Sequence, residues 1–243
     1  MKNVFLISVL ALLTTACNSN LNDPQKIIDK AIATSGGEKY LNSTIEFDFR
    51  DRHYIAKREG GIFSYERITK DSARTTHDFL TNNGFRRKIN GTVVDVADSM
   101  KVRYSASVNS VVYFALLPYA LNDASVQKKF LGATEIENKE QYAVEITFGQ
   151  EDGGEDHEDV FIYWINKKNF AIDYMAYSYA ENDGTGYRFR KAYNPRKVNG
   201  ILFLDYINFK PRGEIKITDF EELFKKGELE ELSKIELLNI QVR

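Results

Sequence analysis

The chain has 243 residues, with 33 Lys and Arg against 35 Asp and Glu, a formal net charge of −2 and one cysteine. This balance, without any basic tract, argues against nucleic-acid binding, whose affinity comes largely from phosphate neutralisation. A content of 43% hydrophobic and 13% aromatic residues can build a real core, which argues against a disordered chain.

The N-terminus has the layout of a secretory signal. Lys2 supplies a positive charge, residues 4–13 form an apolar core, and small residues up to Ala16 lead into Cys17. The apolar core is about half the ~20 residues that a membrane-spanning helix needs. An ordinary signal peptide is the alternative, but lipidation explains why an exported chain carries a single unpaired cysteine.

This segment resembles the bacterial lipobox, although Thr14 stands where leucine is usual. The resemblance implies a signal peptide over residues 1–16 and a lipid anchor on Cys17, with enough acyl chain for stable attachment to a membrane. By analogy, Asn18 favours the outer membrane, facing the periplasm. We expect residues 17–23 to be a short tether and residues 24–243 to be one monomeric domain.

The first elements are a helix and a meander. Asp23-Pro24 predicts a helix start and Gly36-Gly37 its end. From Ile45 the apolar residues alternate with polar ones, which predicts strands. Turn signals then recur about every ten residues, as expected for an antiparallel meander. These turns are Gly60-Gly61, Asp71-Ser72, Asn82-Asn83-Gly84 and Asn90-Gly91.

From Ser99 the apolar residues recur at helical intervals, which predicts a mostly apolar helix with a kinked continuation at Leu116-Leu117-Pro118. Strand patterns return after it, and a last helix is predicted over Glu221 to Lys234. The later strands are predicted at Tyr142 to Phe148, Val160 to Ile165, Phe170 to Tyr179, Tyr187 to Tyr193, Ile201 to Phe209 and Glu214 to Phe220.

The sequence contains no motif that indicates catalysis, a cofactor or a metal. The three histidines lack metal-ligand spacing. The acidic segment Glu151 to Asp159 is typical of a solvated hairpin tip rather than a calcium loop. No nucleophile elbow is present. Two short triplets, at Ser72 and Ser99, resemble the O-glycosylation sequon of Bacteroidetes and lie at predicted turns.

The strand over Val160 to Ile165 is apolar on both faces, and Ile201 to Leu204 is so in part. An antiparallel sheet with one wet face should alternate apolar and polar residues. Either a second layer or helices cover both sides, or the inner face also lines a ligand cavity.

The order of these elements, with Leu116-Leu117-Pro118 and Trp164-Ile165-Asn166-Lys167, resembles the LolA/LolB superfamily of lipoprotein carriers and receptors, which includes the LppX and LprG lipid-binding lipoproteins. The resemblance implies a mainly β fold with helices: a single antiparallel open half-barrel of eleven strands, with helices across its concave face over an apolar cavity.

The function that follows is binding of acyl chains or another apolar small molecule near a membrane, in lipid or lipoprotein trafficking. Two alternatives stay open: an envelope interaction or structural lipoprotein with a filled core, and an enzyme on a curved sheet. The side chains expected to meet in a ligand cavity are Phe114, Leu117, Phe161, Tyr163, Tyr174 and Phe203.

Overall fold

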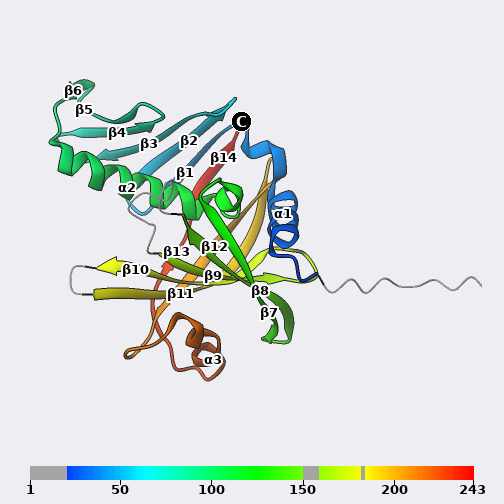
Figure 1. The fold of residues 1–243 in the computed structure, drawn as a ribbon. Coiled ribbons are helices and arrows are strands. Elements are labelled where there is room, and N and C mark those ends of the chain that lie inside the picture. Colours follow the sequence, from blue (N-terminus) through cyan, green and yellow to red (C-terminus); the bar gives the residue numbers. More distant parts are fainter. Residues whose placement is uncertain (1–20, 150–158, 182–183) are drawn as a thin grey trace, which may run out of the picture.

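The computed structural model describes residues 21–149, 159–181 and 184–243, whose strands form two seven-stranded antiparallel sheets (Figure 1). The first sheet has the order β14 (Leu238–Val242), β1 (Ser43–Phe49), β2 (Arg52–Glu59), β3 (Ile62–Lys70), β4 (Thr75–Thr81), β5 (Gly84–Ile89) and β6 (Thr92–Val94). The second has the order β13 (Glu230–Ile235), β12 (Ile201–Lys210), β11 (Gly184–Val198), β10 (Ile172–Glu181), β9 (Val160–Asn166), β8 (Lys139–Phe148) and β7 (Val126–Ile136).

The two sheets are joined through the C-terminal segment, because only Glu236 and Leu237 separate β13 from β14. Buried Asp205 accepts the Leu237 N–H at 3.0 Å and a hydrogen bond from the Arg196 guanidinium at 2.9 Å. Arg196 also donates to the Leu237 carbonyl at 2.6 Å, and these hydrogen bonds fix the connection between β13 and β14. The predicted fold class, mainly antiparallel β in an open half-barrel with helices, is confirmed. The described residues form fourteen strands, however, where the resemblance implied eleven.

Helix α1 (Pro24–Ser35) begins and ends as the sequence predicts. The Asp23 side chain caps it by accepting the Gln25 N–H at 3.0 Å. One face of α1, with Ile27 and Ile28, is buried in the hydrophobic cluster on the concave face of the second sheet. The short helix η1 (Gly37–Tyr40) follows and leads into β1.

Helix α2 (Asp98–Ala115) lies between the two sheets (Figure 1). It contacts β3, β4 and β5, and it buries Val108 and Val112 against Phe47 and Tyr54 of the first sheet. Its C-terminal end reaches the second sheet, and the short helix η2 (Tyr119–Asn122) continues from it. One face of the predicted central helix is therefore buried, whereas Val102 and several neighbouring side chains of the helix are exposed.

Both faces of the second sheet are covered, which explains the two-sided strands. On β9, Phe161 points to the concave face with α1 and α2, whereas Ile162 and Trp164 point to the outer face. There the helices η4 (Ile217–Asp219) and α3 (Phe220–Lys225) pack on the sheet. The Trp164 indole donates to Glu221 at 2.9 Å, which ties α3 to β9.

Two predictions near the C-terminus are wrong. The segment predicted as a strand over 214–220 contains no strand and instead forms η4 and the start of α3, and the helix predicted over 221–234 stops at Lys225. Gly227 adopts a left-handed conformation, with φ 71°, which ends the helix. The residues beyond it extend and pair with the edge of β12 as β13.

Candidate functional site

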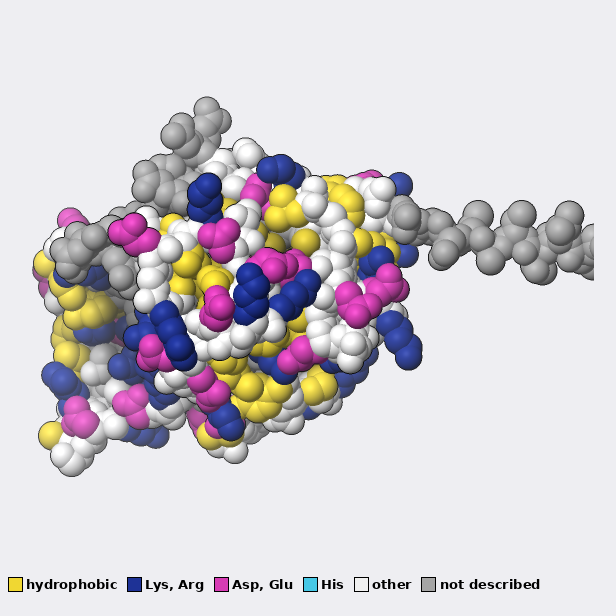
Figure 2. All heavy atoms as spheres, turned by 90° about the horizontal axis from the view of Figure 1, so that it is seen from below, with side chains coloured by type: hydrophobic (Ala, Val, Ile, Leu, Met, Phe, Trp, Pro, Cys, Tyr) yellow, Lys and Arg dark blue, Asp and Glu magenta, His cyan; other side chains and the backbone are white. Residues whose placement is uncertain are grey.

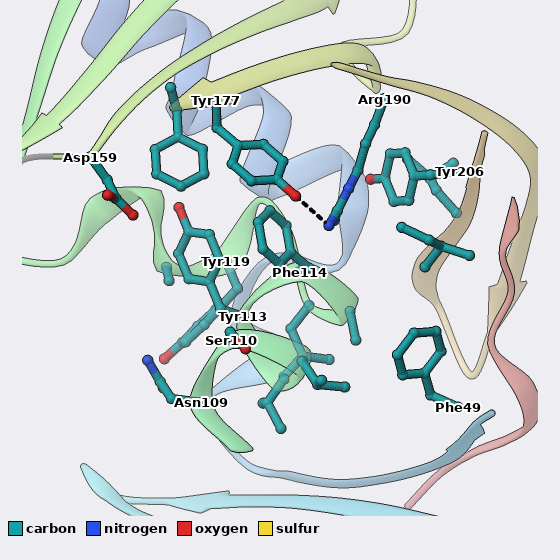
Figure 3. A pocket seen from close by; sticks show the side chains of 18 of the residues that line it. Phe49, Asn109, Ser110, Tyr113, Phe114, Tyr119, Asp159, Tyr177, Arg190 and Tyr206 are labelled. Carbon is teal, nitrogen blue, oxygen red and sulfur yellow. Dashed lines mark hydrogen bonds between the residues drawn. The ribbon is translucent and has the colours of Figure 1, made fainter. Parts of the chain in front are cut away.

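A cavity of about 590 Å³ lies between the C-terminal end of α2 and the concave face of the second sheet (Figure 3). Ligand pockets commonly have volumes of roughly 300–1,000 Å³, so its size suits a small molecule or an acyl chain. Ten of the side chains that line it are aromatic: Phe49, Tyr65, Tyr113, Phe114, Tyr119, Phe148, Phe161, Tyr177, Tyr179 and Tyr206.

The aromatic rings pack against one another and form a continuous wall. The ring centroids of Phe114 and Tyr177 are 5.2 Å apart, and those of Phe161 and Tyr177 are 5.4 Å apart and nearly parallel. Helix α2 therefore supplies one side of this wall and strands β9 and β10 the other. Such a wall binds apolar groups by removing their surface from water, at ~25 cal/mol per Å².

A buried arginine interrupts this apolar lining. Arg190 of β11 is only 9% exposed, and its guanidinium donates to the Tyr177 hydroxyl at 2.7 Å (Figure 3). The guanidinium also lies 4.0 Å from the centroid of the Phe114 ring. None of the ion pairs among the described residues involves Arg190, and its Nε has no hydrogen-bond partner there.

The contacts of Arg190 compensate its burial only in part. A desolvated cation–π contact contributes ~2 kcal/mol, whereas removing an ion from water costs several kcal/mol even after relaxation. The cavity therefore holds a positive charge that its protein neighbours leave incompletely neutralised.

Two further polar side chains of the lining carry buried atoms without a hydrogen-bond partner in the described part of the chain. They are the Nε of Arg58 and the Oδ1 of Asn208. Arg58 stacks on Tyr119, 4.4 Å from its ring centroid, and donates to the Tyr119 hydroxyl at 3.3 Å. Asp123 also lines the cavity and interacts electrostatically with Arg58. Unsatisfied buried groups are few in native proteins, so their concentration at one cavity points to a ligand site.

Burial shifts the pKa of two tyrosines at or near the cavity. It raises the pKa of Tyr206, and the Arg190 charge opposes this rise without cancelling it. Burial likewise raises the pKa of Tyr163 well above its usual value, and its hydroxyl lies 3.1 Å from that of Tyr113 on α2. Tyr206 thus supplies a hydroxyl group to the cavity and no negative charge.

The predicted ligand residues fall into three environments. Phe114 and Phe161 line the cavity. Leu117 and Tyr163 lie in the same hydrophobic cluster, packed behind the lining. Tyr174 lies on the outer face of the sheet, where its hydroxyl donates to Glu137 at 2.8 Å, and Phe203 packs in the cluster between α2 and the first sheet. The expectation that all six meet across one cavity is therefore wrong.

The sequence reasoning missed the polar part of the lining. Around Arg190 the sequence alternates Tyr187, Arg188, Phe189 and Arg190, a pattern typical of a strand with one solvated face. In the structure these side chains do alternate between the two faces, since Phe189 is buried on the outer face and Arg190 lines the cavity on the opposite face. The helix that covers the opposite face turns Arg190 into a buried group, and no local signal reveals that.

Other predicted sites stand apart from the cavity. Both described histidines form carboxylate pairs in the first sheet: His53 with Asp48 and His77 with Glu66, each at 2.7 Å. Among the described residues no group of three or more His, Cys, Asp or Glu could hold a metal ion.

Ser72 is exposed at the turn after β3, as predicted. Ser99 is also exposed, but it lies in the first turn of α2 rather than in a loop. Glycosylation of both serines stays a prediction.

The signal peptide, Cys17, the first residues of the tether and the acidic segment up to residue 158 lie outside the described residues. In the part of the chain that is described, no helix is both long and apolar enough to cross a membrane. On the face seen in Figure 2, described basic and acidic side chains are interspersed, so this face lacks the basic patch that nucleic-acid binding requires.

Comparison with known proteins relates nearly the whole chain to one family. A family described as "Family of unknown function (DUF6503)" matches residues 2–238. No curated protein matches the sequence significantly.

Two solved structures are similar over most of the chain. A DUF1329 family protein from Desulfovibrio piger has 14% sequence identity and a TM-score of 0.51, covering 90% of this chain and 93% of that protein. The LolA superfamily protein NE2245 from Nitrosomonas europaea has 12% identity and a TM-score of 0.49, with the same coverage. At 14% identity the first likeness shows a shared fold.

Proposed function

The chain belongs to the DUF6503 family of unknown function, and we propose that it is a membrane-anchored lipoprotein that binds a lipid or other apolar ligand in its half-barrel. The observation that carries this proposal is the cavity of about 590 Å³, with its wall of aromatic rings beneath α2. The fold is similar to that of a LolA superfamily protein. We extend the proposal to lipid or lipoprotein trafficking in the cell envelope.

The cavity favours this function over the two alternatives. An envelope interaction protein with a filled core has no need for an interior space of ligand size. An enzyme would need a polar cleft with clustered ionisable groups, whereas the lining of this cavity is mainly apolar, with Asp123 and Asp159 as its carboxylates.

The test is a titration with N-phenyl-1-naphthylamine, a neutral apolar fluorophore whose emission rises in apolar surroundings. We expect saturable uptake by the protein at one site per chain. A linear, unsaturable rise would indicate surface adsorption and count against a ligand cavity.

We also propose that Cys17 carries the lipid, which places the half-barrel close to the outer membrane on its periplasmic side. Residues 18–23 can span at most ~20 Å, so the first turn of α1 must lie near the bilayer. Replacing Cys17 with serine should abolish labelling by fatty acid and move the protein from the membrane fraction to the aqueous fraction. A Ser19→Ala variant, which keeps Cys17, should behave as wild type. Retention of the Cys17→Ser variant in membranes would refute the anchor.

A further inference from the structure

We infer that the ligand is a negatively charged amphiphile and that Arg190 binds its head group, a carboxylate or a phosphate. The inference rests on the proposed function, because it names the class of ligand for the same cavity. It follows from the charge and hydrogen-bonding state of a few buried groups.

Arg190 offers more donors than the protein uses. An arginine side chain has five N–H groups, and the one hydrogen bond that Arg190 makes to a described residue is to the hydroxyl of Tyr177. Its guanidinium projects among Tyr177, Tyr206 and Phe114 (Figure 3). A guanidinium binds carboxylate and phosphate oxygens through paired hydrogen bonds, so an anion entering the cavity would meet a group shaped for it.

The neighbouring strand supplies a second unpaired atom. Asn208 of β12 is directly opposite Arg190 of β11 in the sheet, and both side chains line the cavity. The buried Oδ1 of Asn208 accepts no hydrogen bond from the described residues. An unsatisfied donor and an unsatisfied acceptor therefore lie side by side. An acidic group with a neighbouring hydroxyl, as in a glycerol phosphate, offers the acceptor and the donor that these two side chains lack.

The rest of the lining is suited to the apolar tail of the ligand, next to the site of its charged head group. The rings of Phe114, Phe161 and Tyr177 form the apolar wall next to Arg190. Arg50 and Arg58 are the other lining arginines, but Arg50 is exposed to solvent and Asp123 lies within electrostatic range of Arg58. Arg190 is the buried one of the three and forms no ion pair with a described residue, which makes it the stronger anion site.

The experiment measures displacement of N-phenyl-1-naphthylamine by three amphiphiles with the same chain: oleate, 1-oleoyl lysophosphatidate and the uncharged oleyl alcohol. All are used below their critical micelle concentrations, with full-length wild type, Arg190→Gln and Lys191→Gln. Lys191 is the matched control, since it follows Arg190 on β11 but pairs with Glu137 outside the cavity.

We expect wild type to bind both anions at least tenfold more tightly than the alcohol, and the tighter anion identifies phosphate or carboxylate as the natural group. Arg190→Gln should lose this preference and bind the three amphiphiles about equally, and Lys191→Gln should match wild type. If Arg190→Gln does not fold, Arg190→Lys serves instead. It keeps the charge but loses the paired hydrogen bonds, so its preference should shrink.

Equal binding of oleate and oleyl alcohol by wild type would overturn the inference and leave the apolar cavity standing. An unchanged anion preference in both Arg190 variants would overturn the role of Arg190. Failure of wild type to take up the neutral fluorophore would instead overturn the proposed function itself.

Discussion

Replacing Asp78 with asparagine should lower the free energy of unfolding by about 3–5 kcal/mol, because it leaves two arginines without a counter-charge. The Asp78 carboxylate is 2% exposed on β4 and lies 2.6 Å from the Arg67 guanidinium and 2.5 Å from that of Arg87. Asparagine keeps the shape of the side chain but removes its charge. The loss should extend to α2, since Arg67 also donates to Ser107 of that helix at 2.7 Å.

Urea denaturation followed by circular dichroism measures this effect. Glu230→Gln is the control, because Glu230 pairs with Lys210 at 3.3 Å and both side chains are more than 40% exposed. Exposed ion pairs contribute about 0–1 kcal/mol, so this control should change stability little. If Asp78→Asn were as stable as the control, the buried ion-pair network would not hold the first sheet together.

The second large effect separates two residues that both line the cavity. Phe161→Glu should unfold the protein, whereas Phe114→Glu should fold and lose ligand binding. Phe161 is 5% exposed and its ring contacts those of Tyr163 and Tyr177, so its loss costs about 3–5 kcal/mol before the buried charge is counted. Phe114 is only partly buried, and a carboxylate at its position would meet the guanidinium of Arg190.

Thermal melts and fluorophore titrations of both variants test this difference. We expect Phe114→Glu to change stability by about 1–2 kcal/mol and to weaken fluorophore binding at least tenfold, or ~1.4 kcal/mol. Phe114→Leu, which keeps an apolar wall, should bind nearly as wild type does. Unfolding of Phe114→Glu together with normal binding by a folded Phe161→Glu would show that we have reversed their roles.

The fold could be predicted where local signals agree with the tertiary structure. Asp23-Pro24 and Gly36-Gly37 bound α1 because capping and left-handed glycine geometry are local properties. The hairpin turns of the first sheet carry glycine and asparagine for the same reason. The sequence does not predict strand β7, in contrast, because β7 is an edge strand with few buried apolar residues. Its side chains are mainly half-buried or exposed in alternation.

The wrong helix near the C-terminus and the wrong cavity residues have one cause. Both depend on contacts between segments far apart in the sequence, which local patterns do not reveal. Leu229 and Leu232 fit a helical pattern, but this segment pairs with the edge of β12 and forms β13 instead. Alternation along β9 and β10 separates two faces without saying which is concave. Phe161 and Tyr174 were therefore assigned to one cavity, although they lie on opposite faces.

Titration of the full-length protein with N-phenyl-1-naphthylamine tests the central claim most directly, because it asks only whether the cavity of about 590 Å³ admits an apolar molecule. The Phe114→Glu variant, measured alongside, distinguishes the cavity from other apolar surface. We predict saturation at one molecule per chain in wild type, full displacement by oleate, and at least tenfold weaker uptake by Phe114→Glu. Unsaturable emission that is identical in the two proteins would contradict a ligand-binding half-barrel.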